Sequence, residues 1–166
     1  MQNESTTTYM VSFKVGPGFI TIEAKYDKLT RVSFQNTKEQ RENEFIREVK
    51  KDIQSYLKGE KVAFDYPLDF SSLNPSQIRV FKLLQKIPYG KTISYEELAK
   101  KASASLKTRM SPRAIGRILA SNPFPIIIPC HRVINTSGAL GGFSGGLDWK
   151  KYLLKVEGVR TESVWS

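Results

Sequence analysis

The period at which apolar residues recur changes along this chain, and that change limits the folds it can adopt. From Thr7 to Gln35 apolar and polar residues alternate, and β-branched and aromatic side chains are frequent. Alternation with a period of two predicts strands that bury one face. Gly16-Pro17-Gly18 and Asp27-Lys28 interrupt the alternation, so we predict three short strands joined as a meander. Between Lys38 and Lys58 the period becomes helical, and Gly59 is a suitable end for one long helix.

The remainder of the chain carries the signals of several shorter helices. Asn74-Pro75-Ser76-Gln77 combines an N-cap residue, a first-turn proline and a capping-box glutamine. Ser94 to Lys101 has a second capping box, and Ser111-Pro112 begins a third helix that ends before Pro123. The stretch ASASLKTRM, residues 102–110, is small and polar. We predict a loop there that is longer than the turn of an ordinary helix-turn-helix.

These patterns predict an α+β fold with two domains. Residues 1–71 form a β-rich N-terminal domain of strands plus one long helix, and residues 72–166 form a helical C-terminal domain. A length of 166 residues is compatible with two small domains. The consecutive helices that begin near Ser94 and Pro112 resemble a helix-turn-helix, a motif that places its second helix against DNA.

Composition narrows the class of partner. The chain has 26 Lys and Arg residues against 16 Asp and Glu, a net charge of +10. Such an excess favours a polyanion such as nucleic acid, although a basic surface kept for solubility explains the charge alone equally well. No apolar run approaches the roughly 20 residues that cross a bilayer, and the N-terminus lacks the order of a secretory signal. We therefore expect no membrane association and a cytoplasmic location.

The chain has one cysteine and one histidine, Cys130 and His131, and they are adjacent. A single cysteine cannot form an internal disulfide, which fits a reducing compartment. One cysteine with one histidine also cannot complete the usual four-ligand structural zinc site, so we predict no metal. A lone cysteine is more often an inert buried residue than a nucleophile, and that alternative stays open here.

Three features around Cys130 favour a reactive thiol. The imidazole of His131 is the usual type of base for activating a thiol. The preceding IIIP is typical of a buried strand that Pro129 ends, which would fix the backbone beneath the sulfur. Five of the chain's 11 glycines follow within residues 138–149, where they would bring backbone N–H and C=O groups close to a flat ligand. A merely flexible loop is the alternative for these glycines.

An acidic residue completes the pattern. DWKKYLLKVEG predicts a helix capped by Asp148, with an inner face of Trp149, Tyr152, Leu153 and Val156. Glu157 ends this helix, where a carboxylate opposes the helix dipole by about 0.3–1 kcal/mol. A nearby imidazole is one partner that would hold it there, and an ordinary salt bridge is the other. A Cys-His-Glu relay would lower the pKa of the thiol and keep a thiolate ready to attack saturated carbon.

The predicted helix from Pro112 has two unlike faces. At 3.6 residues per turn, one face is core-like and holds Ala114, Ile115, Ile118 and Leu119. The other face carries two arginines and two small residues, namely Arg113, Gly116, Arg117 and Ala120. Gly in a helix interior costs about 1 kcal/mol relative to Ala, so Gly116 needs a reason. We favour a backbone brought close to DNA phosphates, and the close approach of another helix is the alternative.

In this order the motifs resemble one known family. PCHRV, residues 129–133, is preceded by RAIGRILASNPFPIII and followed by GALGGFSGGL and LLKVEG. From about Asn74 to Gly158 this is similar to the O6-alkylguanine-DNA alkyltransferases, also called methylated-DNA–protein-cysteine methyltransferases. The resemblance implies a small ribonuclease-H-like N-terminal domain and a winged-helix-like helix-turn-helix in the C-terminal domain. It also implies a repair protein that binds double-stranded DNA through the minor groove and flips out O6-alkylguanine. The alkyl group then passes irreversibly to the protein's own cysteine, without a cofactor.

The resemblance also assigns chemical roles by position in this sequence. Cys130 would be the alkyl acceptor, His131 its water-linked base and Glu157 the residue that orients the imidazole. Asn122 would be the hinge between the recognition helix and the active-site turn. Tyr95 would donate its hydroxyl proton toward guanine N3 as the alkyl group leaves.

Substrate and DNA contacts are implied in the same way. The backbone groups of Cys130 and Val133 would bind the exocyclic amine, and the Ser144 N–H would bind O6. Leu119 and Pro125 would line the pocket. Substrate contact also includes Phe143, which stands where the family commonly has tyrosine. Arg113 would fill the gap that the flipped nucleotide leaves, and the other DNA-contacting positions are Tyr95, Ala114, Gly116, Arg117, Ala120 and Thr136.

Three other functions compete with alkyl transfer. A non-catalytic alkyltransferase-like lesion-binding protein would read DNA without an acceptor thiol, and Cys130 argues against it. A helix-turn-helix regulator would leave Glu157, Tyr95 and the glycine-rich loop without a joint purpose. A cysteine hydrolase normally takes its histidine from a distant part of the sequence, and no second histidine exists. We therefore predict a single-turnover transferase that acts as a monomer.

Overall fold

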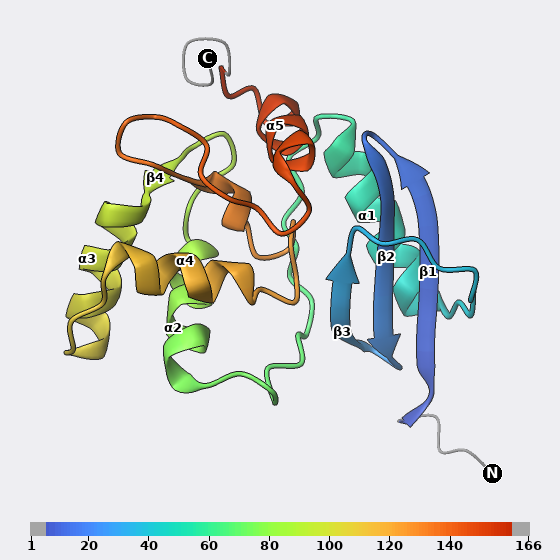
Figure 1. The fold of residues 1–166 in the computed structure, drawn as a ribbon. Helices are drawn as coiled ribbons and strands as arrows, with labels where there is room; N and C mark the ends of the chain where they lie inside the picture. The colour runs from blue at the N-terminus through green and yellow to red at the C-terminus, as the bar shows by residue number, and fades with distance from the viewer. Residues whose placement is uncertain (1–5, 161–166) are drawn as a thin grey trace. The chain divides into compact units, whose positions relative to one another are not determined.

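The computed structural model describes residues 6–160, and the chain divides into two compact units, residues 1–70 and 71–166 (Figure 1). The N-terminal unit holds three strands, β1 (Thr8–Val15), β2 (Gly18–Lys25) and β3 (Lys28–Ser33). They pair antiparallel in the order β1-β2-β3, so the predicted meander is confirmed. Each turn between neighbouring strands has two residues and begins with a residue at φ 53°, Gly16 in one turn and Tyr26 in the other.

One helix, α1 (Glu44–Leu57), covers a face of this sheet (Figure 1). Its buried face consists of Ile46, Val49, Ile53, Tyr56 and Leu57. The helix begins later than the predicted Lys38 because Asn43 is its N-cap, accepting a hydrogen bond from the Ile46 N–H at 2.9 Å. Just before this cap, Arg41 exchanges two backbone hydrogen bonds of 2.8 Å with Met10 of β1. Pairing with the strand therefore takes the place of the first predicted helical turn.

The C-terminal unit begins with α2 (Pro75–Leu84), whose predicted capping box is present. Asn74 Oδ1 accepts a hydrogen bond from the Gln77 N–H, and Gln77 Oε1 accepts one from the Asn74 N–H, each at 2.8 Å. The helix buries Val80, Phe81 and Leu84. The polar signal before this helix was therefore enough to locate its first residue.

The next helix, α3, is longer than predicted. It spans Tyr95–Leu106, so the predicted loop over 102–110 is wrong for its first five residues. Ala102 is fully buried, and the Ser103 hydroxyl donates to the Ala99 carbonyl at 2.7 Å, so these small residues suit a helix that packs closely. The connection to α4 (Pro112–Ala120) is reduced to residues 107–111. Its length falls closer to that of an ordinary helix-turn-helix than the sequence indicated.

Two further local predictions are corrected. The IIIP segment is a buried turn rather than a strand, because the Ile128 N–H donates to the Phe124 carbonyl at 2.8 Å and Ile126 has φ 76°. The last helix, α5 (Leu147–Val156), has Gly146 rather than Asp148 at its N-cap. Gly146 adopts φ 92°, which an aspartate would rarely accept. The buried residues of α5 are Trp149, Lys150, Leu153 and Leu154, whereas Tyr152 and Val156 are only half-buried.

Two short strands and one 3₁₀ turn complete this unit. The strands β4 (Ile93–Ser94) and β5 (Val133–Ile134) pair in parallel, and the 3₁₀ turn η2 (Cys130–Arg132) lies directly before β5. The α+β fold is confirmed, while the winged-helix detail stays a prediction. None of the helices within residues 6–160 has both the length and the apolar character needed to span a bilayer.

Candidate active site

A buried turn links α4 to the single cysteine. Asn122 follows α4, and its amide Nδ2 donates to the Ile128 carbonyl at 3.0 Å. The same side chain accepts a hydrogen bond from the Phe124 N–H at 2.9 Å. Ile126, inside the turn, is a β-branched residue at φ 76°, a conformation that costs about 1–3 kcal/mol and persists only where its surroundings enforce it. Asn122 thus holds together the two ends of a strained segment that leads straight into Cys130.

Cys130 lies at the inner wall of a cavity of about 500 Å³. That volume is typical of a small-molecule site. The wall is built from α3, α4, η2 and the loop before α5, with the lining residues Tyr95, Pro112, Arg113, Gly116, Leu119, Ala120, Cys130, Asn135, Gly141, Gly142, Phe143 and Ser144. Eight of the site residues predicted from the sequence are thereby brought together, whereas Pro112 and Asn135 had not been predicted as site residues.

Other predicted site residues stand outside this wall. Pro125 and Val133 are buried, and Ala114 is half-buried. Arg117 is exposed on α4. Thr136 is also exposed, and its hydroxyl donates to Glu96 Oε2 at 3.2 Å. Their predicted contacts with substrate or DNA stay predictions.

The thiol of Cys130 is 4% exposed, and this burial raises its pKa to about 11. A hydrogen bond with Asn122 and the charge of Lys150 act in the opposite direction, followed by the backbone N–H groups of Cys130 and His131. The expectation of a standing thiolate is therefore wrong for the protein without DNA. The thiol holds its proton at neutral pH, so any nucleophilic step needs a group that accepts this proton.

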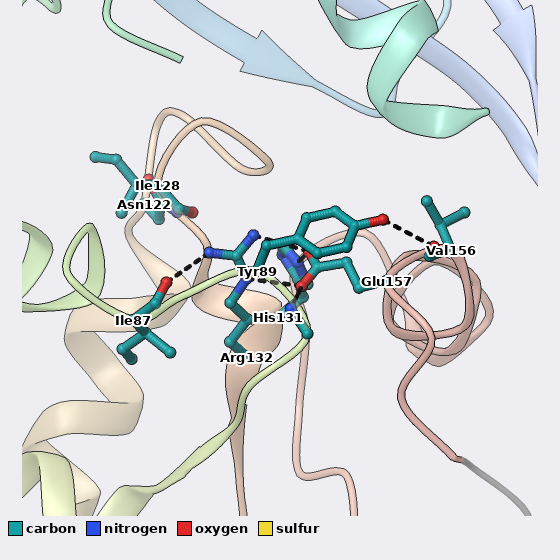
Figure 2. A network of polar contacts seen from close by, with 9 residues as sticks. Ile87, Tyr89, Asn122, Ile128, His131, Arg132, Val156 and Glu157 are labelled. Carbon is teal, nitrogen blue, oxygen red and sulfur yellow. Dashed lines mark hydrogen bonds and ion pairs between the residues drawn. The ribbon is translucent and has the colours of Figure 1, made fainter. Parts of the chain in front are cut away.

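His131 and Glu157 form the buried pair that the relay requires (Figure 2). Their Nε2 and Oε2 atoms are 2.6 Å apart, and both side chains are fully buried. Burial lowers the pKa of His131, and the hydrogen bond and charge of Glu157 only partly oppose this. A neutral imidazole that donates Nε2–H to a carboxylate has its lone pair on Nδ1. This is the protonation state of a general base.

Glu157 also binds a cation, Arg132, so both of the partners considered for it from the sequence are present. Arg132 donates from Nε to Oε1 at 2.9 Å and from the second guanidinium nitrogen to Oε2 at 3.0 Å. The Gly90 N–H adds a hydrogen bond to Oε1 at 2.9 Å. Arg132 is itself held by the Ile87 carbonyl at 2.7 Å, as Figure 2 shows. The carboxylate at the end of α5 is thus stabilised by several donors, despite the unfavourable helix dipole.

The exposed face of α4 borders the cavity. An added Cβ on Gly116 would meet nothing within 4 Å apart from its chain neighbours and the backbone of its own helix, so the alternative that this glycine admits a neighbouring helix is wrong within the described residues. Arg113, Arg117 and Ala120 are exposed on the same face. The helix therefore presents two cations and a smooth backbone to whatever lies outside it.

Tyr95, on α3, forms another part of the cavity wall. Burial raises the pKa of its hydroxyl, with a smaller contribution from the charge of Cys130, so the group remains a proton donor at neutral pH. The glycine-rich loop presses against its ring. A Cβ on Gly141 would come within 2.8 Å of Tyr95 Oη and Cε2, and Gly141 has φ 72°. At this position the glycine is required, so the loop is more than a flexible connection.

Two cations of the site, Arg132 and Lys150, had not been predicted from the sequence. Lys150 is fully buried on α5. The signal was available, since positions 150, 153, 154 and 157 share one face of a helix and Leu153 and Leu154 are apolar. A lysine in an apolar stripe is uncommon and indicates a specific partner.

Comparisons with known proteins agree with this geometry. Residues 75–159 match the family model "6-O-methylguanine DNA methyltransferase, DNA binding domain", and residues 7–70 match "6-O-methylguanine DNA methyltransferase, ribonuclease-like domain". The methylated-DNA--protein-cysteine methyltransferase of Methanosarcina acetivorans is 35% identical over 158 residues, covering 90% of this chain and 98% of that protein. The DNA base-flipping protein of Thermus thermophilus is 40% identical over 111 residues, which is 66% of this chain and 71% of that protein.

A solved structure extends the similarity to the fold. A crystal structure of Mycobacterium tuberculosis OGT in complex with DNA superposes with a TM-score of 0.75 and 31% identity. The match covers 90% of this chain and 93% of the other.

Proposed function

The chain belongs to the 6-O-methylguanine DNA methyltransferase family, and from this premise we propose that it repairs DNA by taking the alkyl group of O6-alkylguanine onto Cys130. The transfer is irreversible, so each molecule acts once. The observation that carries the proposal is the position of the chain's single thiol on the wall of a cavity sized for a small molecule and bordered by a basic helix.

The chemistry is a displacement at saturated carbon. The Sγ of Cys130 forms a bond to the alkyl carbon while the bond from that carbon to guanine O6 breaks, and the electron pair enters the purine. The raised pKa of Tyr95 keeps its hydroxyl protonated, and it donates this proton toward guanine N3 as the charge arrives. The thiol proton passes through a water to Nδ1 of His131, and Glu157 stabilises the imidazolium that results. The proton lost by the thiol then replaces the one given to the purine, so Tyr95 and His131 end neutral, guanine is restored and Cys130 remains as a thioether.

DNA is bound by the exposed face of α4. Arg117 supplies charge to the phosphates, and the small residues Gly116 and Ala120 let the backbone approach the minor groove. Arg113, at the rim of the cavity, fills the space in the stack that the flipped guanine leaves. Ala114 and Thr136 add contacts with the DNA backbone. Leu119, Phe143 and Ser144 line the base pocket, and Pro125 also contacts the base. The backbone groups of Cys130 and Val133 bind its exocyclic amine, and the Ser144 N–H binds O6.

The site supports transfer over lesion binding alone because an acceptor thiol stands where the base would lie. We also propose that the protein is a cytoplasmic monomer, an assignment that rests on its single cysteine and on a site built from one chain.

Mass spectrometry tests the reaction directly. The protein is incubated with duplex DNA carrying O6-methylguanine, and its intact mass and peptide map are then recorded. We expect a gain of one methyl group on the peptide that contains Cys130, and we expect Cys130→Ala to bind the same DNA without any gain. Binding by the wild type with no change in mass would favour the lesion-binding alternative and overturn the transferase.

A further inference from the structure

The buried ammonium of Lys150 holds two segments of the site together. Its side chain, on α5, is 0% exposed, and a lysine is almost never buried to this extent without polar partners. Its Nζ donates to the carbonyls of Val133 at 2.6 Å, of Leu140, and of Gly142 at 3.3 Å. An ammonium has three N–H donors, and here each has a backbone acceptor.

These acceptors are placed where they control the cavity. Val133 belongs to β5, which is paired with β4 at the start of α3. Leu140 and Gly142 flank Gly141, the residue whose missing Cβ lets the loop rest on the Tyr95 ring. The Nζ atom is also 5.8 Å from the centroid of that ring, within the range of a cation–π contact. One charge therefore joins β5, the glycine-rich loop and Tyr95.

We propose that Lys150 is a positioning residue for alkyl transfer: its ammonium fixes loop 135–146 against Tyr95 and so sets the wall of the pocket that faces Cys130. The effect on transfer rests on the proposed function, whereas the clamp itself does not. Without the ammonium, the buried carbonyls of Val133 and Leu140 and the more exposed one of Gly142 lose this donor, and the loop loses the contacts that keep Phe143 and Ser144 at the cavity.

The charge acts on the titratable groups around it as well. These groups are Tyr95 from α3 and the adjacent pair Cys130 and His131 from η2. The ammonium lowers the pKa of the Cys130 thiol and contributes to the lowered pKa of His131. The ammonium therefore lowers the free energy needed to form the attacking thiolate of Cys130. Burial lowers the pKa of Lys150 itself to about 8, and the charge of Cys130 partly opposes this.

This arrangement predicts a pH dependence that a purely structural lysine would not produce. Because His131 takes the thiol proton inside the site, transfer does not depend on the bulk thiolate fraction of Cys130, whereas the ammonium fraction of Lys150 falls above about pH 8. The transfer rate of the wild type should therefore fall above about pH 8. In Lys150→Met the rate should start lower and show no such fall.

Hydrogen exchange on the free protein tests the clamp without reference to any reaction. We compare Lys150→Met with Lys151→Met, which removes the neighbouring but exposed charge on α5. Amides of residues 135–146 should exchange at least about tenfold faster in Lys150→Met, with α2 unchanged and Lys151→Met like the wild type. Equal loop exchange in the two variants would overturn the clamp.

If Lys150→Met does not fold, the wild-type protein can be used to test the same clamp. Between pH 7 and 9 its loop amides should gain exchange relative to the amides of α2, which report the intrinsic effect of pH. A constant ratio would overturn the proposal.

Single-turnover transfer from saturating methylated duplex completes the experiment. Lys150→Met should lose at least about tenfold in the rate of the bound complex while its affinity for DNA stays within twofold of Lys151→Met. An unchanged rate would overturn the positioning role. A wild type that accepts no methyl group would instead overturn the proposed function and leave the exchange result standing.

Discussion

The two units bury different kinds of side chain. Among the described residues, the buried polar groups of the N-terminal unit are two threonines, Thr7 and Thr21, and its core is otherwise apolar. The C-terminal unit buries Asn122, His131, Lys150 and Glu157, of which three can carry charge, and all four surround Cys130 or the residues that hold it. Buried charges cost free energy unless every partner is present. The N-terminal unit is therefore stabilised mainly by apolar packing, whereas the C-terminal unit holds a site whose buried charges each need their partners.

Glu157→Gln tests this contrast with the largest expected effect. The amide removes the charge shared by His131 and Arg132, so the free energy of unfolding of the C-terminal unit should fall by about 3–5 kcal/mol. Transfer from bound DNA should slow because the imidazolium is no longer stabilised, while DNA affinity is kept. Urea unfolding and single-turnover rates measure the two effects. The exposed Glu97→Gln is the control, and an equal stability for both variants would contradict the role given to the buried pair.

Ile53→Ala tests whether the N-terminal unit, whose core is apolar, affects stability without affecting the site. Ile53 is fully buried on α1, and its truncation should cost about 2–5 kcal/mol. Because the site is built from residues of the other unit, the transfer rate of folded molecules should not change. Hydrogen exchange resolved by segment should show loosening in the sheet and α1, with Lys51→Ala as the exposed control. A loss of transfer in the folded variant would contradict the claim that the N-terminal unit does not contribute to the site.

Acid should weaken only the unit that contains His131, the chain's single histidine. Burial lowers the pKa of His131 below its usual value of 6.5, so the unfolded state takes up the proton more readily than the folded state. The stability that comes from the neutral ring is complete above pH 6.5 and is lost as pH falls through the lower pKa of the folded protein. Amides of α5 should thus lose protection between pH 7 and 5, relative to those of α1. Parallel losses in both helices would contradict the assignment.

The same contrast shows how far the sequence can predict the molecule. The capping box at Asn74 and the two turns of the meander are local, and they were located to within one residue because the residues that determine them are neighbours in the chain. The ASASL segment was placed in a loop on composition, although burial of Ala102 makes it helical. Tertiary contact decided that outcome, and no local pattern reports it.

The site, too, has features that could be predicted from the sequence and features that could not. Cys130, His131 and Glu157 could be grouped because the motif places them in a known order, and their geometry followed from the fold. The raised pKa of the thiol could not be predicted, since it depends on burial that only the folded chain creates. The same holds for Lys150, whose three acceptors lie on β5 and in the glycine-rich loop.

Arg117→Ala tests the exposed face of α4, where a substitution should change DNA binding without changing the stability of either unit. Arg117 is exposed on α4, so its removal should change the free energy of unfolding by no more than about 0.5 kcal/mol. A contact with phosphate predicts weaker binding to every duplex, whether alkylated or not, and a salt dependence of log affinity reduced by about one unit of slope. Fluorescence anisotropy across a salt series measures both quantities. Arg47→Ala, which removes an exposed arginine of α1, should leave the slope unchanged. If the two variants lose the same slope, the basic charge acts through the whole protein rather than through α4, and the docking face proposed for that helix is wrong.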